Sequence, residues 1–148
     1  MTTQVAHWEH FRHPAGVGVR GVGESLDQAF EQAGLALTAV VADPAKVRPA
    51  QPVVIECEAS RASLLLLDWL EALIREMNTR RMRFSRFELH LGPPDLGGGL
   101  GLYALAWGEA QDSDPHPPPA DLKGPTYEEL EVTQDEHDRW IAQCVVEV

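Results

Sequence analysis

The sequence reads LLLLDWL from Leu64 to Leu70, and this stretch decides how the chain folds. It is apolar almost all round, so a helix built on it must be buried over most of its surface. Ser60 or Ser63 is placed to cap such a helix, and one apolar face continues as far as Asn78. The sequence therefore predicts a deeply buried helix against which the other elements pack.

A second helix is predicted nearer the N-terminus. Ser25 is a good N-cap, and Gln28 three residues later completes a capping-box pattern. The helix is expected to end at Asp43-Pro44, because a proline disfavours helical geometry in the residue before it. Apolar residues recur at helical spacing over this segment: Leu26, Ala29, Phe30, Ala33, Leu37, Val40 and Val41.

The remaining segments alternate between apolar and polar residues, which is typical of half-buried strands. The glycines at 97–101 precede a strand rather than a helix, so they indicate a hairpin turn and not a phosphate-binding loop. Prolines between Gln111 and Asp121 exclude a regular element there. The predicted strands are Val5–Phe11, Val17–Val22, Val53–Glu58, Phe84–Leu91, Leu100–Trp107, Tyr127–Val132 and Trp140–Val148. This order predicts a single α+β domain over residues 1–148, with a mainly antiparallel sheet packed with two helices.

Composition narrows the classes of function. The formal net charge of -11 argues against nucleic-acid binding by the surface as a whole, because phosphates are repelled. Five of the 12 Lys and Arg residues nevertheless lie close together: Arg75, Arg80, Arg81, Arg83 and Arg86. We expect a solvated helix end and turn there, with contact to RNA or to an acidic partner as the alternative.

The sequence also indicates a location. No run reaches the ~20 apolar residues of a membrane span, and the first residues lack the apolar stretch of a signal peptide. Cys57 and Cys144 lie in separate apolar patterns, so we expect two reduced core cysteines, with a disulfide as the alternative. A cytoplasmic protein without membrane contact is predicted.

Two charged residues are candidates for a site. Asp68 lies inside the apolar stretch, where a bare carboxylate is costly, so we expect it to accept hydrogen bonds from a neighbouring loop. Lys123 enters a strand from the proline-rich segment. A solvated lysine is its simplest interpretation, and anion binding or pairing with Asp68 or Glu147 are the alternatives.

Catalytic chemistry is poorly supported. His7, His10 and His13 are spaced by three, but in an extended segment His10 points away from the other two, which argues against a three-histidine metal site. No nucleophile with a matched base is visible, so an independent hydrolase has little support. The residues by themselves leave the function open.

Taken in order, several segments resemble the archease family over nearly the whole chain, with their spacing kept. The DWL helix together with K-x-x-T-Y is fairly specific. The segments are His13–Gly18 (HPAGVG, against HTADVG), Gly23–Ala33 (the S-L-x-x-x-F-x-x-A helix), Leu66–Ile74 (LLDWLEALI, against LLxDWLNELL), Gly108-Glu109, His116, Leu122–Tyr127 (LKGPTY, against VKAVTYH) and Val145–Val148 (VVEV, against a closing LDI or LDV).

This resemblance implies an archease-like α+β fold and a non-catalytic role as protein cofactor of an RtcB-type RNA-splicing ligase. Such proteins promote guanylylation and turnover of the ligase in tRNA splicing and RNA repair, and RNA is contacted only through the ligase. The alternative is an archease-fold binding or chaperone-like module that has lost metal-dependent ligase activation. A homo-oligomer is compatible with either.

The resemblance also implies a divalent cation, Ca²⁺ or Mg²⁺, held by the aspartate of HTAD and by the C-terminal aspartate. Gly16 stands at the first position and supplies no side-chain oxygen, whereas Glu147 stands at the second. Glu128 replaces the histidine that follows Thr-Tyr. Glu147, the terminal carboxylate of Val148 and Asp68 are the remaining oxygen donors. Because hard cations want several oxygens at short distances, we expect weak or absent metal binding.

Four residues are expected to support this site or a partner: His13, Asp68, Lys123 and Thr126. If Asp68 orients the loops, the buried helix, the lysine-led strand and the last residues of the chain should meet. They would form a small anionic pocket at one edge of the fold.

Overall fold

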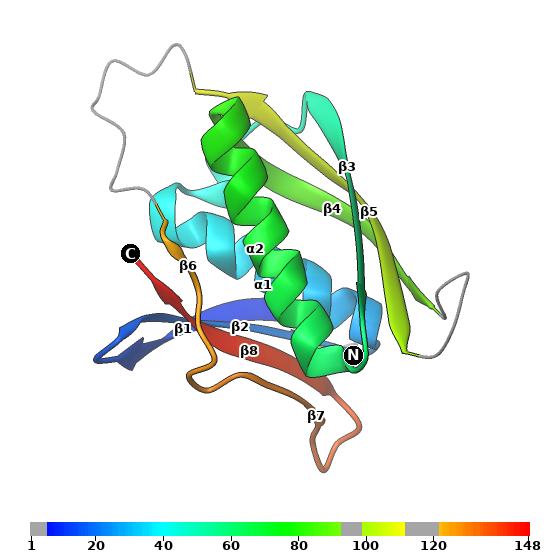
Figure 1. Cartoon of the computed structure of the whole chain (residues 1–148). Helices are drawn as coiled ribbons and strands as arrows, with labels where there is room; N and C mark the ends of the chain where they lie inside the picture. Colours follow the sequence, from blue (N-terminus) through cyan, green and yellow to red (C-terminus); the bar gives the residue numbers. More distant parts are fainter. Residues whose placement is uncertain (1–5, 93–98, 112–121) are drawn as a thin grey trace, which may run out of the picture.

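A computed structural model describes residues 6–92, 99–111 and 122–148 of the chain. The α+β class with antiparallel pairing, expected from the sequence, is confirmed (Figure 1). The elements are β1 (His7–His13), β2 (Gly16–Gly23), α1 (Leu26–Val41), the 3-10 turn η1 (Pro44–Lys46), β3 (Gln51–Ala59), α2 (Ala62–Arg80), β4 (Met82–Gly92), β5 (Leu100–Ala110), β6 (Gly124–Pro125), β7 (Glu131–Gln134) and β8 (Trp140–Glu147).

The strands form two sheets, a division that the strand patterns alone did not indicate. Sheet A has the order β1-β2-β8-β6, with β7 also paired to β8, and sheet B has the order β3-β5-β4. Helix α1 contacts β2 and β8 of sheet A and β4 of sheet B, while α2 contacts strands of both sheets (Figure 1). Each sheet therefore packs one face against the helices and leaves the other face open.

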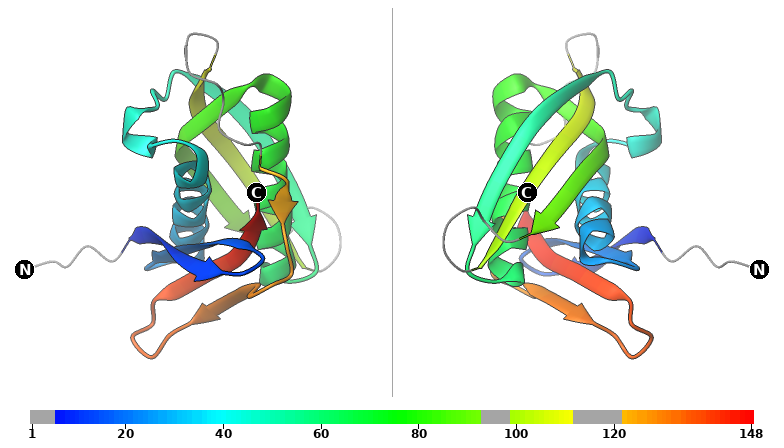
Figure 2. Two further views of the ribbon diagram at one scale, coloured as in Figure 1. Left: turned by 90° about the vertical axis from the view of Figure 1, so that its left-hand side faces the viewer. Right: turned by 90° about the vertical axis from the view of Figure 1, so that its right-hand side faces the viewer.

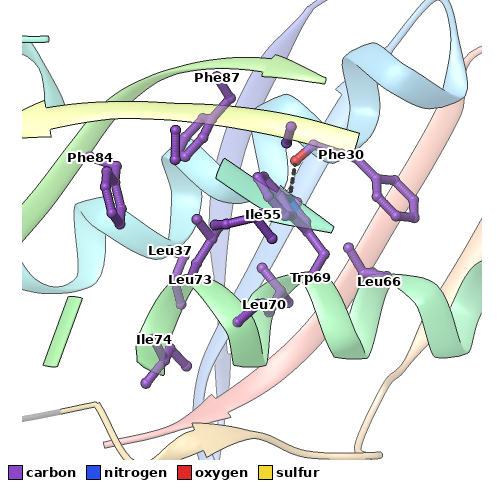
Figure 3. Close-up of a cluster of buried hydrophobic side chains, with 14 of the residues drawn as sticks. Phe30, Leu37, Ile55, Leu66, Trp69, Leu70, Leu73, Ile74, Phe84 and Phe87 are labelled. Atoms are coloured by element: carbon purple, nitrogen blue, oxygen red, sulfur yellow. Dashed lines mark hydrogen bonds between the residues drawn. The ribbon is translucent and has the colours of Figure 1, made fainter. Parts of the chain in front are cut away.

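Helix α2 is as deeply buried as the LLLLDWL stretch predicts. The Trp69 side chain is fully buried, and its indole N–H donates a hydrogen bond to the carbonyl oxygen of Phe30 on α1 at 3.0 Å (Figure 3). Its ring meets that of Phe87 on β4 edge-on, with centroids 5.5 Å apart. One side chain thus joins α2, α1 and sheet B, and this core holds the molecule together.

The expected cap of this helix is wrong. The N-cap is Arg61, which has extended backbone geometry and makes no side-chain cap bond, while Ser63 already lies inside the helix. The Leu65 N–H bonds to the Arg61 carbonyl at 3.0 Å, so the N-cap falls between the two candidates, one residue after Ser60 and two before Ser63. It also continues beyond Asn78 to Arg80. Burial of the apolar face fixes this helix without a side-chain cap.

Helix α1 begins as predicted. The Gln28 N–H donates to Ser25 Oγ at 3.1 Å, and the Gln28 side chain accepts from the backbone N–H of Glu24 at 2.7 Å, one residue earlier than in a standard capping box. The helix packs tightly on β2 at Gly21, where an added Cβ would lie 2.1 Å from the Ala29 carbonyl oxygen. Only glycine allows this contact between helix and strand.

The strand predicted over Tyr127–Val132 is wrong for its first four residues, since only Glu131 and Val132 lie in a strand. Two short strands, β6 and β7, pair with successive parts of β8, with Gly124 opposite Glu147 and Glu131 opposite Gln143 (Figure 2). A turn separates them, and its residue Glu129 has a left-handed backbone with φ of 56°. A left-handed residue breaks the pleat, so one continuous strand cannot form.

Other expectations concern particular segments. Strands β4 and β5 pair as a hairpin with Gly92 opposite Gly101, but most of the expected glycine turn lies outside the described residues, as do His116 and residues 112–121.

Cys57 is half-buried and Cys144 is buried; both are free, and burial raises the pKa of each thiol to about 11. In the described parts of the chain, no helix is long and apolar enough to cross a membrane.

Candidate functional site

Several of the residues singled out in the sequence meet at one end of sheet A. His13 pairs with Gly16 across β1 and β2, and the space beside Gly16 is filled by β8, with Glu147 Cα 3.2 Å from the position of a Cβ on Gly16. The Lys123 N–H donates to the Glu147 carbonyl at 2.9 Å on the other side of β8. Directly opposed residues of antiparallel strands point to the same face, which applies to His13, Gly16 and Glu147. Lys123 directly precedes Gly124, the residue opposite Glu147. We call His13, Gly16, Glu147 and Lys123 the end row.

The charges of the end row are solvated. Lys123 Nζ lies 4.0 Å from Glu147 Oε1, and the two side chains are 68% and 54% exposed. An exposed pair at this distance contributes little to stability, so both groups stay available to a partner. This agrees with the simplest interpretation of Lys123, a solvated lysine, and the acidic side chain at 4.0 Å from it is that of Glu147.

His13 is positioned by the hairpin that carries it. Its Nδ1 accepts a hydrogen bond from the Ala15 N–H at 3.1 Å, which orients the ring at the tip of the β1–β2 hairpin. His10 points the other way, as predicted, and its Nε2 lies 2.7 Å from the Ala36 carbonyl oxygen of α1. The three histidines of β1 are thus not gathered into one site.

Thr126 supports the end row through hydrogen bonds to the backbone of β8. Its backbone N–H and its hydroxyl both donate to the Val145 carbonyl, at 2.9 and 2.8 Å, and the Glu128 N–H donates to its hydroxyl at 3.1 Å. These bonds fix the turn after β6 against β8. Thr126 thereby holds Lys123 and the chain end in place, and its own hydroxyl is used up in doing so.

Asp68 does not join the end row, which corrects the expectation of one pocket containing it. The Asp68 carboxylate forms no hydrogen bond or ion pair with any residue within 6–92, 99–111 or 122–148. Partial burial, and then the charge of Glu71, raises the pKa of its carboxyl. The charged residues that α2 places opposite Lys123 are Glu71 and Arg75, one and two turns further along.

The residues present do not fit a divalent cation. A Cβ on Gly16 would lie 2.1 Å from the Val146 carbonyl oxygen, so β2 and β8 approach more closely than any side chain at this position allows. Glu147 and the terminal carboxylate of Val148 are the nearby acidic groups. Over the described parts of the chain, no three His, Cys, Asp or Glu side chains converge as metal ligands would. Ca²⁺ needs six to eight oxygens, more than these two carboxylates supply.

The open face of sheet A carries a network that sequence reasoning missed. Arg20 on β2 donates to Glu9 Oε1 on β1 at 2.7 Å and to Gln143 Oε1 on β8 at 2.8 Å. Its guanidinium also lies over the Phe11 ring, 4.7 Å from the centroid. The hydrogen bond from Arg20 lowers the pKa of Glu9. Arg20 and Gln143 are 123 residues apart, so no local pattern could have indicated their contact.

The cluster of arginines does not form one surface. Arg80 pairs with Glu76 on α2, whereas Arg86 pairs with Glu88 on β4 and lies over the Trp107 ring, 5.9 Å from its centroid. Arg83 is buried. The simplest expectation, a solvated helix end and turn, fits all of them except Arg83.

Comparison with known proteins identifies the family. Residues 8–148 match the model of the Archease protein family. The chain belongs to the archease family. Protein archease of Pyrococcus abyssi is 33% identical over 141 residues, covering 95% of this chain and 98% of its own. Protein archease of Thermococcus gammatolerans is 33% identical over 138 residues, with 93% and 96% covered.

The archease fold is likewise seen in a solved structure. The solution structure of protein 1598 of Methanobacterium thermoautotrophicum superposes with a TM-score of 0.81 at 28% identity, covering 95% of this chain and 98% of that one. The family resemblance drawn from the motifs is therefore confirmed. The whole end row lies within the part of the chain that matches the archease model.

Proposed function

We propose that this archease is a non-catalytic accessory of an RtcB-type RNA-splicing ligase in the cytoplasm, promoting guanylylation and turnover of the ligase in tRNA splicing or RNA repair. The observation that carries the proposal is the end row: the positions that the family motifs mark, far apart in sequence, lie side by side on one sheet. RNA is reached only through the ligase, since a protein of net charge -11 repels phosphates over most of its surface.

The end row suits recognition of another protein better than chemistry. Lys123 and Glu147 are solvated charges of opposite sign, and His13 adds a donor or acceptor on the same face. Strand pairing fixes the backbones of His13 and Glu147, and the Lys123 N–H bond to the Glu147 carbonyl fixes that of Lys123, so the three side chains start from set positions when a partner docks. Because Gly16 leaves no room for a ligand to a cation, we propose that contact with the ligase depends on these side chains and not on a resident metal.

The test is a guanylylation assay with the RNA ligase of the same organism, at limiting concentrations of the archease. Lys123→Ala, Glu147→Gln and His13→Ala should each lower the rate by about two- to tenfold, the range for solvated contacts at an interface. Glu58→Gln, an exposed carboxylate on the open face of sheet B, serves as the matched control and should leave the rate unchanged. If the wild-type chain has no effect on guanylylation or turnover, the proposal fails.

A second candidate is a binding or chaperone-like module that no longer activates a ligase. The close approach of Val146 to Gly16 favours this candidate, because the two strands leave no space for an aspartate side chain at position 16. Gly16→Asp separates the two candidates, with Gly16→Ala as the control for the steric effect of a Cβ alone. Activation that appears only in the aspartate variant would assign the natural protein to this second class.

A further inference from the structure

A cleft between α2 and β6 stands next to the end row but faces a different side of β6. We propose that this cleft binds a nucleoside phosphate, with Arg75 and Lys123 on the phosphate and Tyr127 against the base. Its volume of about 500 Å³ suits a ligand of this size. Leu67 and Ile74 give it an apolar floor, and Glu71 and Asn78 add polar groups along α2.

The walls of the cleft are fixed by hydrogen bonds. Asn78 Nδ2 on α2 donates to the Leu122 carbonyl at 3.3 Å, which ties the segment before β6 to the helix. The side chain of Leu122 is buried, and the next residue, Lys123, is bonded through its N–H to Glu147. The backbone of Lys123 is thereby held on one wall, and α2 carries Arg75 on the other, so the cleft itself is present before a ligand binds.

Two cations of this cleft lack a close counter-ion. Arg75 forms no ion pair or hydrogen bond with any residue that the structure describes, and Lys123 has only the solvated contact with Glu147 at 4.0 Å. Arg80 on the same helix is different, because Glu76 neutralises it. Guanidinium and ammonium groups facing each other across a gap match the oxygens of a phosphate, which the arginine can bind through two parallel bonds.

Tyr127 points to a nucleotide and not to a bare anion. Its side chain is 75% exposed, the most exposed large hydrophobic side chain in the described parts of the chain. The turn that carries it is closed by the Leu130 N–H bonding to the Tyr127 carbonyl at 3.3 Å. An exposed aromatic ring beside cations is a platform on which a base can stack. The carboxylate of Glu71 accepts hydrogen bonds only, which suits ribose hydroxyls and repels a second phosphate.

The test uses the full chain labelled with ¹⁵N and titrated with AMP, GMP, CMP and UMP in separate NMR experiments, with the matching nucleosides and inorganic phosphate as probes of the two halves of the ligand. Amide shifts are expected in residues 71–78 and 122–128, with tighter binding of mononucleotides than of either half. Arg75→Ala and Lys123→Ala should each weaken binding by about tenfold, as for hydrogen bonds to charged groups. Tyr127→Ala should weaken it, whereas Tyr127→Phe should not.

Arg80→Ala is the matched control, because Arg80 lies on the same helix outside the cleft, and binding should be unchanged. The proposal is overturned by the absence of shifts at millimolar nucleotide, by phosphate alone binding as tightly as a mononucleotide, or by an acidic peptide binding the cleft in preference to nucleotides. No ligase is present in this experiment. Loss of binding in Arg75→Ala with full stimulation of the ligase separates this site from the proposed function, because Arg75 is not part of the end row.

Discussion

The two sheets share one plan and differ in how their open faces are held. On sheet A, Arg20 joins three strands, with hydrogen bonds to Glu9 on β1 and Gln143 on β8. On sheet B, Arg86 pairs with Glu88 within β4 and lies over the Trp107 ring of β5 without a hydrogen bond between the strands. Side chains that bridge strands fix their register as well as their distance. The strands of sheet A are therefore the more firmly tied by side chains on their open face.

The open face of sheet B carries exposed apolar and acidic side chains. Its open face leaves the side chains of Val54 and Tyr103 53% and 47% exposed, with the carboxylates of Glu56 and Glu58 beside them on β3. Scattered apolar residues on an open face are ordinary in soluble domains. The comparison teaches that both sheets bury one face in the core, whereas side-chain hydrogen bonds join three strands on the open face of sheet A and a single arginine–ring contact joins two on sheet B in the described residues.

The shared core should give the largest effect. Trp69→Ala removes a fully buried ring and its bond to Phe30, and should lower the free energy of unfolding by about 3–5 kcal/mol. Trp107→Ala, on the open face of sheet B, should cost clearly less. Urea denaturation followed by far-UV circular dichroism measures both. Equal losses would show that the open face of sheet B is as tightly organised as the core.

Gly16 tests how closely the strands of sheet A approach each other. Gly16→Ala places a Cβ against the Val146 carbonyl and should destabilise the fold by about 1–3 kcal/mol, the usual cost of overpacking. Gly124→Ala is the control on the adjoining strand β6: no described atom lies within 4 Å of its added Cβ, so a change within about 0.5 kcal/mol is expected. If the Gly16→Ala protein is as stable as wild type, a side chain does fit at position 16, and the steric argument against a metal ligand there is wrong.

Arg20 tests the network itself. Arg20→Met should lower the free energy of unfolding by about 1–2 kcal/mol, because Gln143 and Glu9 both lose a charge-assisted hydrogen bond. Because Glu9 is partly exposed to solvent, we expect a value near the lower end of this range. Arg86→Met on sheet B should cost less. The lowered pKa of Glu9 adds a pH signature: its share of the loss is complete above the ordinary value of 4.5 and fades as the pH falls through the folded-state pKa. Melts at several pH values between 3 and 7 measure it, and a loss independent of pH would remove Glu9 from the network.

Asp68 should give the smallest effect, with the opposite sign. Its folded-state pKa is raised by partial burial, so the ionised carboxylate disfavours the folded state above that pKa and carries no penalty below the ordinary value of 3.8. Asp68→Asn should therefore stabilise the protein slightly at neutral pH, with the gain disappearing in acid. Destabilisation at neutral pH would reveal a partner for Asp68 that the described residues do not supply.

Much of the fold follows from local signals. The capping pair Ser25 and Gln28 starts α1, and the apolar surface of residues 64–70 buries α2, because both act within a few residues of the chain. The cap expected at Ser60 or Ser63 failed since burial outweighs a single hydrogen bond. The strand expected at Tyr127–Val132 failed because a left-handed residue, Glu129, interrupts it, and glutamate carries no sign of that conformation.

The residues of the candidate site also fall into two groups, those that motifs along the chain indicate and those that only the structure reveals. Family motifs sufficed to single out His13, Lys123 and Glu147, since each keeps its place in an ordered pattern along the chain. The contacts of Arg20 could not be found from such motifs, because they depend on which strands lie side by side.

The sequence by itself determined that residue 16 has no oxygen to offer a cation, because glycine has no side chain. Only the tertiary structure decided that no other side chain fits there either. The Val146 carbonyl, 130 residues further along the chain, occupies the space where a Cβ would stand. The distance between two strands is set by all the packing around them, and no local stretch of residues encodes it.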